Sequence, residues 1–182
     1  DRRIVFDWRT DEDSDLGDGL IQVGLASEFS GKSAEGVAVR QEIGGGRNVT
    51  MTVVGVKPGR VLTDCEFSPN DRGLGLTGGT FNQVDDRQAL LICFDRDVIV
   101  ESAAIVAGNG QCGGCYRMAG HAPLHIYCVD ADNDTEDQSG VLSDLGVLKA
   151  RRPLLLDSSP HLGVESPGRW RLAALTIRLP KS

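Results

Sequence analysis

Short runs of alternating apolar and polar residues, separated by glycine, proline and acidic residues, recur along this chain. Successive side chains of a β-strand point to opposite faces, so alternation with a period of two predicts strands that bury one face. Such runs cover residues 4–8, 20–26, 36–43, 48–57, 61–67, 88–94, 97–106, 124–129, 153–156 and 170–179. So many short strands between turn residues predict an all-β fold in which two antiparallel sheets pack as a β-sandwich.

Two of these runs stand out because only a short polar link separates them. Residues 88–94 carry apolar side chains on both faces, which is typical of a strand in the middle of a sheet. Residues 97–106 alternate less strictly. Because Asp95, Arg96 and Asp97 supply turn chemistry between the two runs, we predict that the runs form a β-hairpin packed on the core.

The run at residues 170–179 predicts a terminal strand with one clearly apolar face. Simple alternation places Leu172, Ala174, Thr176 and Arg178 opposite Ala173, Leu175, Ile177 and Leu179. We expect this strand to pair with the first strand and to close the sandwich. Helical periodicity is scarce, and residues 141–150 are expected to form one short helical turn at most, because Gly146 interrupts them.

The stretch from Gly73 to Val106 carries a resemblance to a known family. It contains GLGL, then NQVDDRQALLICF, then FDRDVIVESAAIV. This order resembles the pattern of exported bacterial β-sandwich proteins that often carry a PEP-CTERM-type sorting tail, with Gln88 at a position where Glu is commoner. The resemblance implies export and a jelly-roll-like sandwich. It implies no particular chemistry.

Length and charge narrow the choices further. A chain of 182 residues is expected to form one β-sandwich domain over residues 1–182. A net charge of −7 repels phosphate backbones, so we expect no nucleic-acid partner. We also expect no membrane span, because no apolar run approaches the roughly 20 residues that a bilayer requires. The chain begins at Asp1 without Met, as a mature or trimmed protein would, which is compatible with an extracellular or cell-surface location.

Cysteine spacing leaves three interpretations open. The chain has five cysteines, and Cys112 and Cys115 are separated by two glycines. This pair fits a disulfide, a redox or metal-binding loop with the nearby residues His121, His125 and Cys128, or unpaired structural thiols. Cys93 and Cys128 fall on apolar strand faces, where small buried thiols are common.

The acidic segment at residues 130–140 predicts a candidate calcium site. Alternate residues of an extended loop can point their carboxylates at one ion, and calcium takes about six to eight oxygen ligands. The spacing resembles the first half of an EF-hand or dockerin loop, although Thr135 replaces the turn glycine and Val141 replaces the closing glutamate. The alternative is an acidic loop that serves solubility. The candidate ligands are Asp130, Asp132, Asp134 and Glu136.

Motifs for catalysis are scarce in the sequence, which contains no nucleophile elbow, zinc-protease helix or phosphate loop. We therefore interpret the chain as a non-enzymatic binding or structural module for extracellular polysaccharide or a cell-surface component. Sugar sites use exposed aromatic rings with polar neighbours, and Tyr116 and Tyr127 are the candidate ligand-binding residues. Trp8 and Trp170 are expected to pack in the core or at a sheet edge. The alternative function is a metal-binding or redox protein that uses the loop of Cys112 and Cys115.

Overall fold

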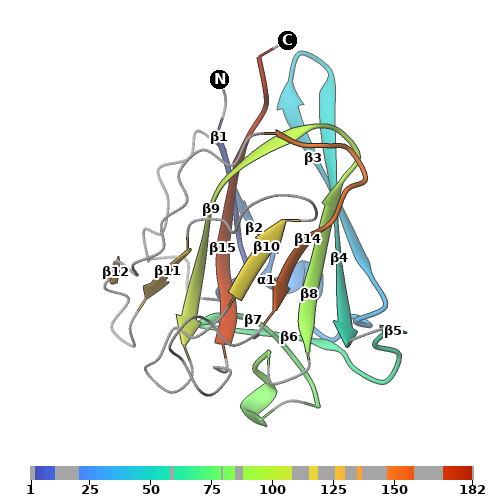
Figure 1. Cartoon of the computed structure of the whole chain (residues 1–182), viewed down its shortest axis with the longest axis vertical. Helices are drawn as coiled ribbons and strands as arrows, with labels where there is room; N and C mark the ends of the chain where they lie inside the picture. The colour runs from blue at the N-terminus through green and yellow to red at the C-terminus, as the bar shows by residue number, and fades with distance from the viewer. Residues whose placement is uncertain are drawn as a thin grey trace.

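The computed structural model describes residues 3–10, 21–57, 60–78, 80–84, 88–107, 115–118, 126–129, 135–136, 147–157 and 170–181. In these ranges the chain forms two β-sheets that enclose a shared hydrophobic core (Figure 1). Most strand pairs are antiparallel. The predicted fold class, an all-β, jelly-roll-like sandwich of two sheets, is confirmed.

The larger sheet contains nine strands in the described part of the chain. They are β1 (Arg3–Asp7), β2 (Ile21–Gly24), β6 (Phe67–Asn70), β7 (Gly73–Leu76), β9 (Val98–Ala107), β11 (Ile126–Val129), β12 (Thr135–Glu136), β13 (Val147–Leu148) and β15 (Trp170–Arg178). The order along its main path is β12-β11-β9-β15-β1-β2, while β13 pairs with β9, and β7 pairs with both β15 and β6.

The smaller sheet contains six strands in the same described ranges. They are β3 (Val37–Gly44), β4 (Arg47–Lys57), β5 (Arg60–Val61), β8 (Ala89–Phe94), β10 (Cys115–Met118) and β14 (Leu154–Asp157). The order is β10-β14-β8-β4-β3, with β5 paired to β4. β8 lies between β14 and β4, which confirms that it is a central strand.

The pairing of the first and last strands is confirmed. β1 runs antiparallel to β15, from Arg3 opposite Arg178 to Asp7 opposite Ala174. Two pairings differ from the predicted antiparallel order, because β1 is parallel to β2 and β9 is parallel to β11. β15 thus lies between β1 and β9 in the middle of the larger sheet.

The predicted hairpin between residues 88–94 and 97–106 is wrong. β8 belongs to the smaller sheet and β9 to the larger one, so the link from Asp95 to Asp97 crosses between the two layers. The Asp95 carboxylate accepts a hydrogen bond from the backbone N–H of Thr50, at 2.8 Å. The Asp97 carboxylate accepts one from the backbone N–H of Ala150, also at 2.8 Å. Polar turn residues can satisfy backbone donors both in a hairpin within one sheet and in a link that crosses between two sheets. The composition of residues 95–97 therefore did not distinguish these two connections.

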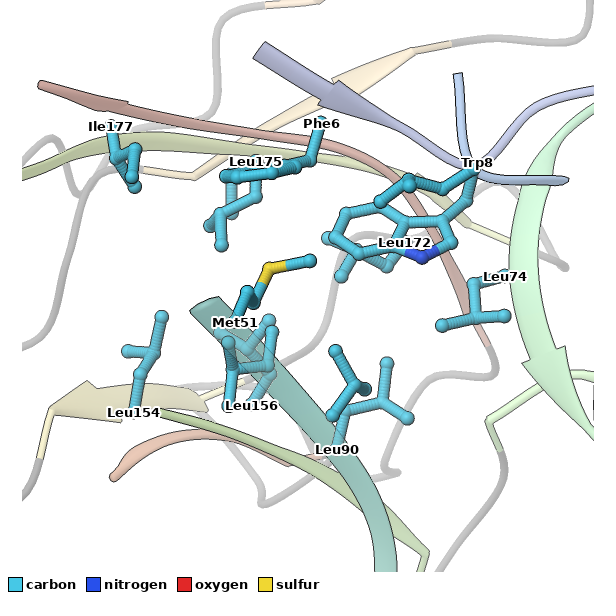
Figure 2. Close-up of a cluster of buried hydrophobic side chains, with 14 of the residues drawn as sticks. Phe6, Trp8, Met51, Leu74, Leu90, Leu154, Leu156, Leu172, Leu175 and Ile177 are labelled. Carbon is cyan, nitrogen blue, oxygen red and sulfur yellow. The ribbon is translucent and has the colours of Figure 1, made fainter. Parts of the chain in front are cut away.

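Simple alternation along β15 is also wrong, because the strand is interrupted. The register against β9 shifts between Leu172 and Ala174, which marks a β-bulge or irregularity. As a result Leu172 and Leu175 both enter the main core, although strict alternation places them on opposite faces. Figure 2 shows both side chains in the same cluster as Phe6 and Trp8. Both tryptophans are core residues, as predicted, since Trp8 and Trp170 are buried.

Three further segments depart from their predictions. Residues 61–67 do not form one strand, because Val61 ends β5 and Phe67 begins β6. Residues 20–26 end in a short helix, α1 (Ala26–Phe29), whose Phe29 ring meets Trp8 edge-on with ring centres 5.8 Å apart. Residues 141–150 are expected to form one short helical turn at most, and at their described end Leu148 instead pairs with Val98 as part of β13. Burial of Leu148 against the core outweighs the weak local helix propensity.

Candidate binding site at the Arg171 end of the sandwich

The two tyrosines chosen as ligand-binding residues lie in different sheets. Tyr116 is in β10 of the smaller sheet, opposite Leu156, and Tyr127 is in β11 of the larger sheet, opposite Ala104. The strand registers therefore do not place both tyrosines on one sheet face. Their side chains lie outside what the structure describes, so their role stays a prediction.

The candidate metal and cysteine sites fall almost entirely outside the described residues. Asp130, Asp132, Asp134 and Cys112 are outside them. For Glu136 and Cys115 the backbone alone is described: Glu136 lies in β12 opposite Cys128, and Cys115 begins β10 opposite Asp157. Within the described ranges, no three His, Cys, Asp or Glu side chains are grouped so that they could hold a metal ion. The calcium, disulfide and metal-loop hypotheses stay predictions.

The two cysteines whose side chains are described, Cys65 and Cys93, are free thiols. Cys93 is half-buried in β8, and burial raises its pKa above the ordinary value for a thiol. The thiolate is the reactive form of cysteine, so a raised pKa makes Cys93 a poor nucleophile at neutral pH. Its setting agrees with the structural role predicted for it.

A buried arginine organises one end of the sandwich. Arg171 in β15 is only 4% exposed. Its Nη1 donates to the backbone carbonyls of Ser68 and Gly73, and its Nη2 donates to the carbonyl of Phe81 at 3.0 Å. A rigid guanidinium with several donors suits this task, because one side chain can join three separate carbonyls. Arg171 thus ties β6, β7 and the turn at residues 80–82 to the central strand of the larger sheet.

The positively charged side chain of Arg171 is bound mainly by neutral groups. Burial lowers the pKa of Arg171, the negative charge of Asp71 opposes that shift, and the positive charge of Arg72 adds to it. A guanidinium stays protonated in proteins even so. Because its described hydrogen bonds go to carbonyl oxygens, Arg171 acts here as a brace for the backbone.

Close backbone approach explains the glycines of the GLGL segment. A Cβ at Gly73 would lie 2.4 Å from the carbonyl oxygen of Leu172, and Gly73 has a φ of +129°. A Cβ at Gly75 would lie 1.8 Å from the carbonyl oxygen of Asn82. These distances are far below van der Waals contact, so both positions require glycine. The two glycines of the GLGL segment therefore have a packing role.

The turn braced by Arg171 presents an exposed aromatic ring. Phe81 lies in the helical turn η1 (Thr80–Asn82), and its side chain is 81% exposed. Phe81 and Asn82 have φ values of 55° and 56°, in the left-handed region that residues other than glycine rarely adopt. In Figure 1 this green turn lies at the lower end of the sandwich, away from the two chain termini. A large ring held outward on an unfavourable backbone is a feature associated with function.

Sequence reasoning missed both Phe81 and Arg171. Phe81 follows two glycines and a threonine, a context that looked like a plain turn. Arg171 lies between Trp170 and Leu172 in a strongly apolar run. A single arginine inside such a run is the sequence signal that could have indicated a buried arginine.

A depression of about 510 Å³ lies beside β6. β6 connects it with the brace, because Pro69 lines the depression and the neighbouring Ser68 accepts from Arg171. At Arg9 the buried guanidinium pairs with both carboxylate oxygens of Asp7, at 3.0 and 2.6 Å, so its charge is largely neutralised. The lining residues are Arg9, Thr10, Gly24, Ala26, Ser27, Ser30 and Pro69. Hydroxyl groups near a neutralised ion pair suit uncharged polar ligands better than anions.

Comparison with protein-family models, with curated proteins and with solved structures finds no match to this chain. The resemblance to exported sandwich proteins with a sorting tail therefore stays a prediction. Among the described residues, no helix is both long enough and apolar enough to cross a membrane.

Proposed function

We propose that this chain is an exported, non-enzymatic binding or structural module, whose partner is extracellular polysaccharide or a cell-surface component. The observation that carries this proposal is the end of the sandwich braced by Arg171, where an exposed Phe81 ring projects from a backbone fixed from within. Binding residues commonly lie on loops that a rigid scaffold positions, and a β-sandwich provides such a scaffold.

Rigid presentation supports binding in physical terms. A ligand that meets a preorganised surface does not have to order the loop, so less of the contact energy is lost as conformational entropy. Three hydrogen bonds from one buried guanidinium give this end of the sandwich that property. The hydroxyl-lined depression next to β6 adds polar groups beside one of the strands that Arg171 binds.

The test is retention of the whole chain during native electrophoresis in gels that contain neutral or acidic polysaccharides. Retention of the wild type supports a polysaccharide partner. Tyr116→Ala and Tyr127→Ala test the two tyrosines: each is expected to leave the melting temperature nearly unchanged and to weaken retention. Migration of the wild type that no polysaccharide slows, together with no binding to isolated cell-surface fractions, would contradict the proposal.

The proposal includes a structural calcium ion held by Asp130, Asp132, Asp134 and Glu136. An ion that binds only the folded state stabilises it by mass action. Millimolar calcium added to chelated protein is therefore expected to raise the melting temperature, and Asp132→Ala is expected to abolish that rise. An unchanged melting temperature in the wild type would leave the segment as an acidic loop without a cation.

A further inference from the structure

The surroundings of Phe81 indicate what kind of surface it meets. Among the described residues, the exposed large apolar side chains are Phe81 and Val61, which is 45% exposed. The exposed residues described close to Phe81 along the chain, Gly78 and Asn82, lack a side chain or are polar. Asp71 and Arg72 are also exposed, and their charges act on Arg171, which binds the Phe81 carbonyl. Phe81 is thus a flat apolar ring whose described exposed neighbours along the chain are polar or glycine.

We propose that Phe81 stacks on the apolar face of a pyranose ring in a neutral polysaccharide. This inference rests on the binding function proposed above and assigns its contact residue and ligand class. A pyranose ring presents C–H groups on one face and hydroxyl groups around its edge. One aromatic ring with the exposed amide of Asn82 next to it along the chain matches that distribution, since the ring covers the C–H face and the amide can hydrogen-bond to the hydroxyls.

A protein partner fits the same surface less well. Stable protein interfaces bury about 800 Å² on each partner, with an apolar centre and a polar rim. Among the described residues, only Phe81 and Val61 are exposed large apolar side chains, too few for the apolar centre of such an interface. A ligand whose repeating unit is the size of one ring therefore suits this site better than a protein face.

Charge selects neutral over acidic polysaccharide. The chain carries a net charge of −7, so a polyanion is repelled over distances of about 8 Å at physiological salt. The arginines at this end do not reverse that sign, because Arg171 is buried on backbone carbonyls and Arg72 lies beside Asp71. A neutral polysaccharide meets no such repulsion.

The brace makes Phe81 testable without disturbing the fold. Arg171 binds the backbone carbonyl of Phe81, so replacing the side chain leaves the hydrogen bond in place. The ring itself is largely exposed and contributes little to the core. Val61→Ala is the matched control, because it removes the other exposed large apolar side chain and leaves Phe81 intact.

The experiment measures affinity electrophoresis of the wild type, Phe81→Ala, Phe81→Tyr and Val61→Ala in gels containing β-glucan, xylan, galactomannan or dextran, with alginate as the acidic probe. Phe81→Ala is expected to lose at least about tenfold in affinity for the neutral polysaccharide that the wild type binds best, as loss of a central aromatic contact does. Phe81→Tyr keeps the flat ring and is expected to bind like the wild type, as is Val61→Ala. All four melting temperatures are expected to agree closely.

Three results would overturn the inference, and they differ from one another. If the wild type binds a neutral polysaccharide and Phe81→Ala binds it equally well, Phe81 is not the contact residue, and the proposed binding function stands. Stronger retention in alginate than in every neutral gel overturns the ligand class. If no polysaccharide retains the wild type, the proposed polysaccharide function and this inference fall together.

Discussion

At the scale of single residues, the GLGL segment shows how closely the brace is packed. A side chain at Gly75 would meet the carbonyl oxygen of Asn82 at 1.8 Å and the Nη1 atom of Arg171 at 2.9 Å. Gly24 differs, since a Cβ there meets nothing within 4 Å. Packing therefore requires glycine at position 75 but not at position 24, so Gly24 serves as the control for Gly75.

Gly75→Ala is expected to lower the free energy of unfolding by about 1–3 kcal/mol, because the turn carrying Phe81 must shift away from β7. Gly24→Ala is expected to change that free energy by less than about 0.5 kcal/mol in either direction. Urea denaturation of both variants and the wild type measures the difference. Equal effects at the two positions would mean that the contact between β7 and the turn is not as close as described.

The sequence does not reveal what the turn at residues 80–82 presents. The Phe81 carbonyl, in a residue with left-handed backbone, accepts a hydrogen bond from Arg171, which lies 90 positions further along the chain. Local propensity holds no information about a partner at that separation, because a phenylalanine is normally unfavourable at positive φ. An exposed ring on a strained turn is therefore visible only once the tertiary contact is known.

At the scale of elements, strand positions were more predictable than their connections. Alternation located β1, β3, β4, β8, β9, β14 and β15 close to their observed bounds, because each strand buries one face on the shared core. Alternation does not reveal which sheet a strand joins. The polar link from Asp95 to Asp97 was assigned to a hairpin for that reason, although it crosses between the layers.

Asp97 makes this crossing sensitive to acid. The backbone N–H of Ala150 and the Nζ of Lys149, at 3.3 Å, both donate to its carboxylate, and these contacts lower the pKa of Asp97 below the ordinary value. A carboxyl whose pKa is lower in the folded state contributes stability above its unfolded pKa, near about 4, and loses it as the pH falls through the lower folded value.

The stability difference between the wild type and Asp97→Asn is therefore expected to be present at pH 7 and to disappear progressively below about pH 4. Denaturation in urea at a series of pH values measures it. Lys149→Met is the partial control: it removes the second hydrogen-bond donor and keeps the amide of Ala150, so the pKa of Asp97 is expected to rise without reaching the ordinary value. A pH-independent difference between wild type and Asp97→Asn would contradict this account.

At the scale of the whole molecule, the sandwich follows from composition and pattern, while the site does not. Apolar faces on many short strands require two layers that cover each other, and the observed core draws residues from both sheets. The candidate site instead arises where β6, β7 and the turn at residues 80–82 meet Arg171. That meeting depends on the order of strands in the larger sheet, which no local pattern encodes.

The core of the larger sheet also depends on the shift in β15. Leu172 and Leu175 are both fully buried, and Leu175 lies opposite Phe6 of β1 on one side and Ala103 of β9 on the other. Strict alternation would put the two leucines on opposite faces of the sheet. In Figure 2 they lie together, facing Met51 of the smaller sheet across the core.

Leu172→Asp and Leu175→Asp are therefore both expected to leave the chain largely unfolded, because each removes a buried leucine and buries a carboxyl group without a partner, at a cost of the same order as the roughly 5–15 kcal/mol by which folded domains are stable. Val61→Asp, at an exposed position, is expected to keep the wild-type fold. Far-ultraviolet circular dichroism and thermal melting distinguish these outcomes. If Leu175→Asp unfolds the chain and Leu172→Asp is tolerated, the side chains of β15 alternate without interruption. The register shift between Leu172 and Ala174 would then be contradicted.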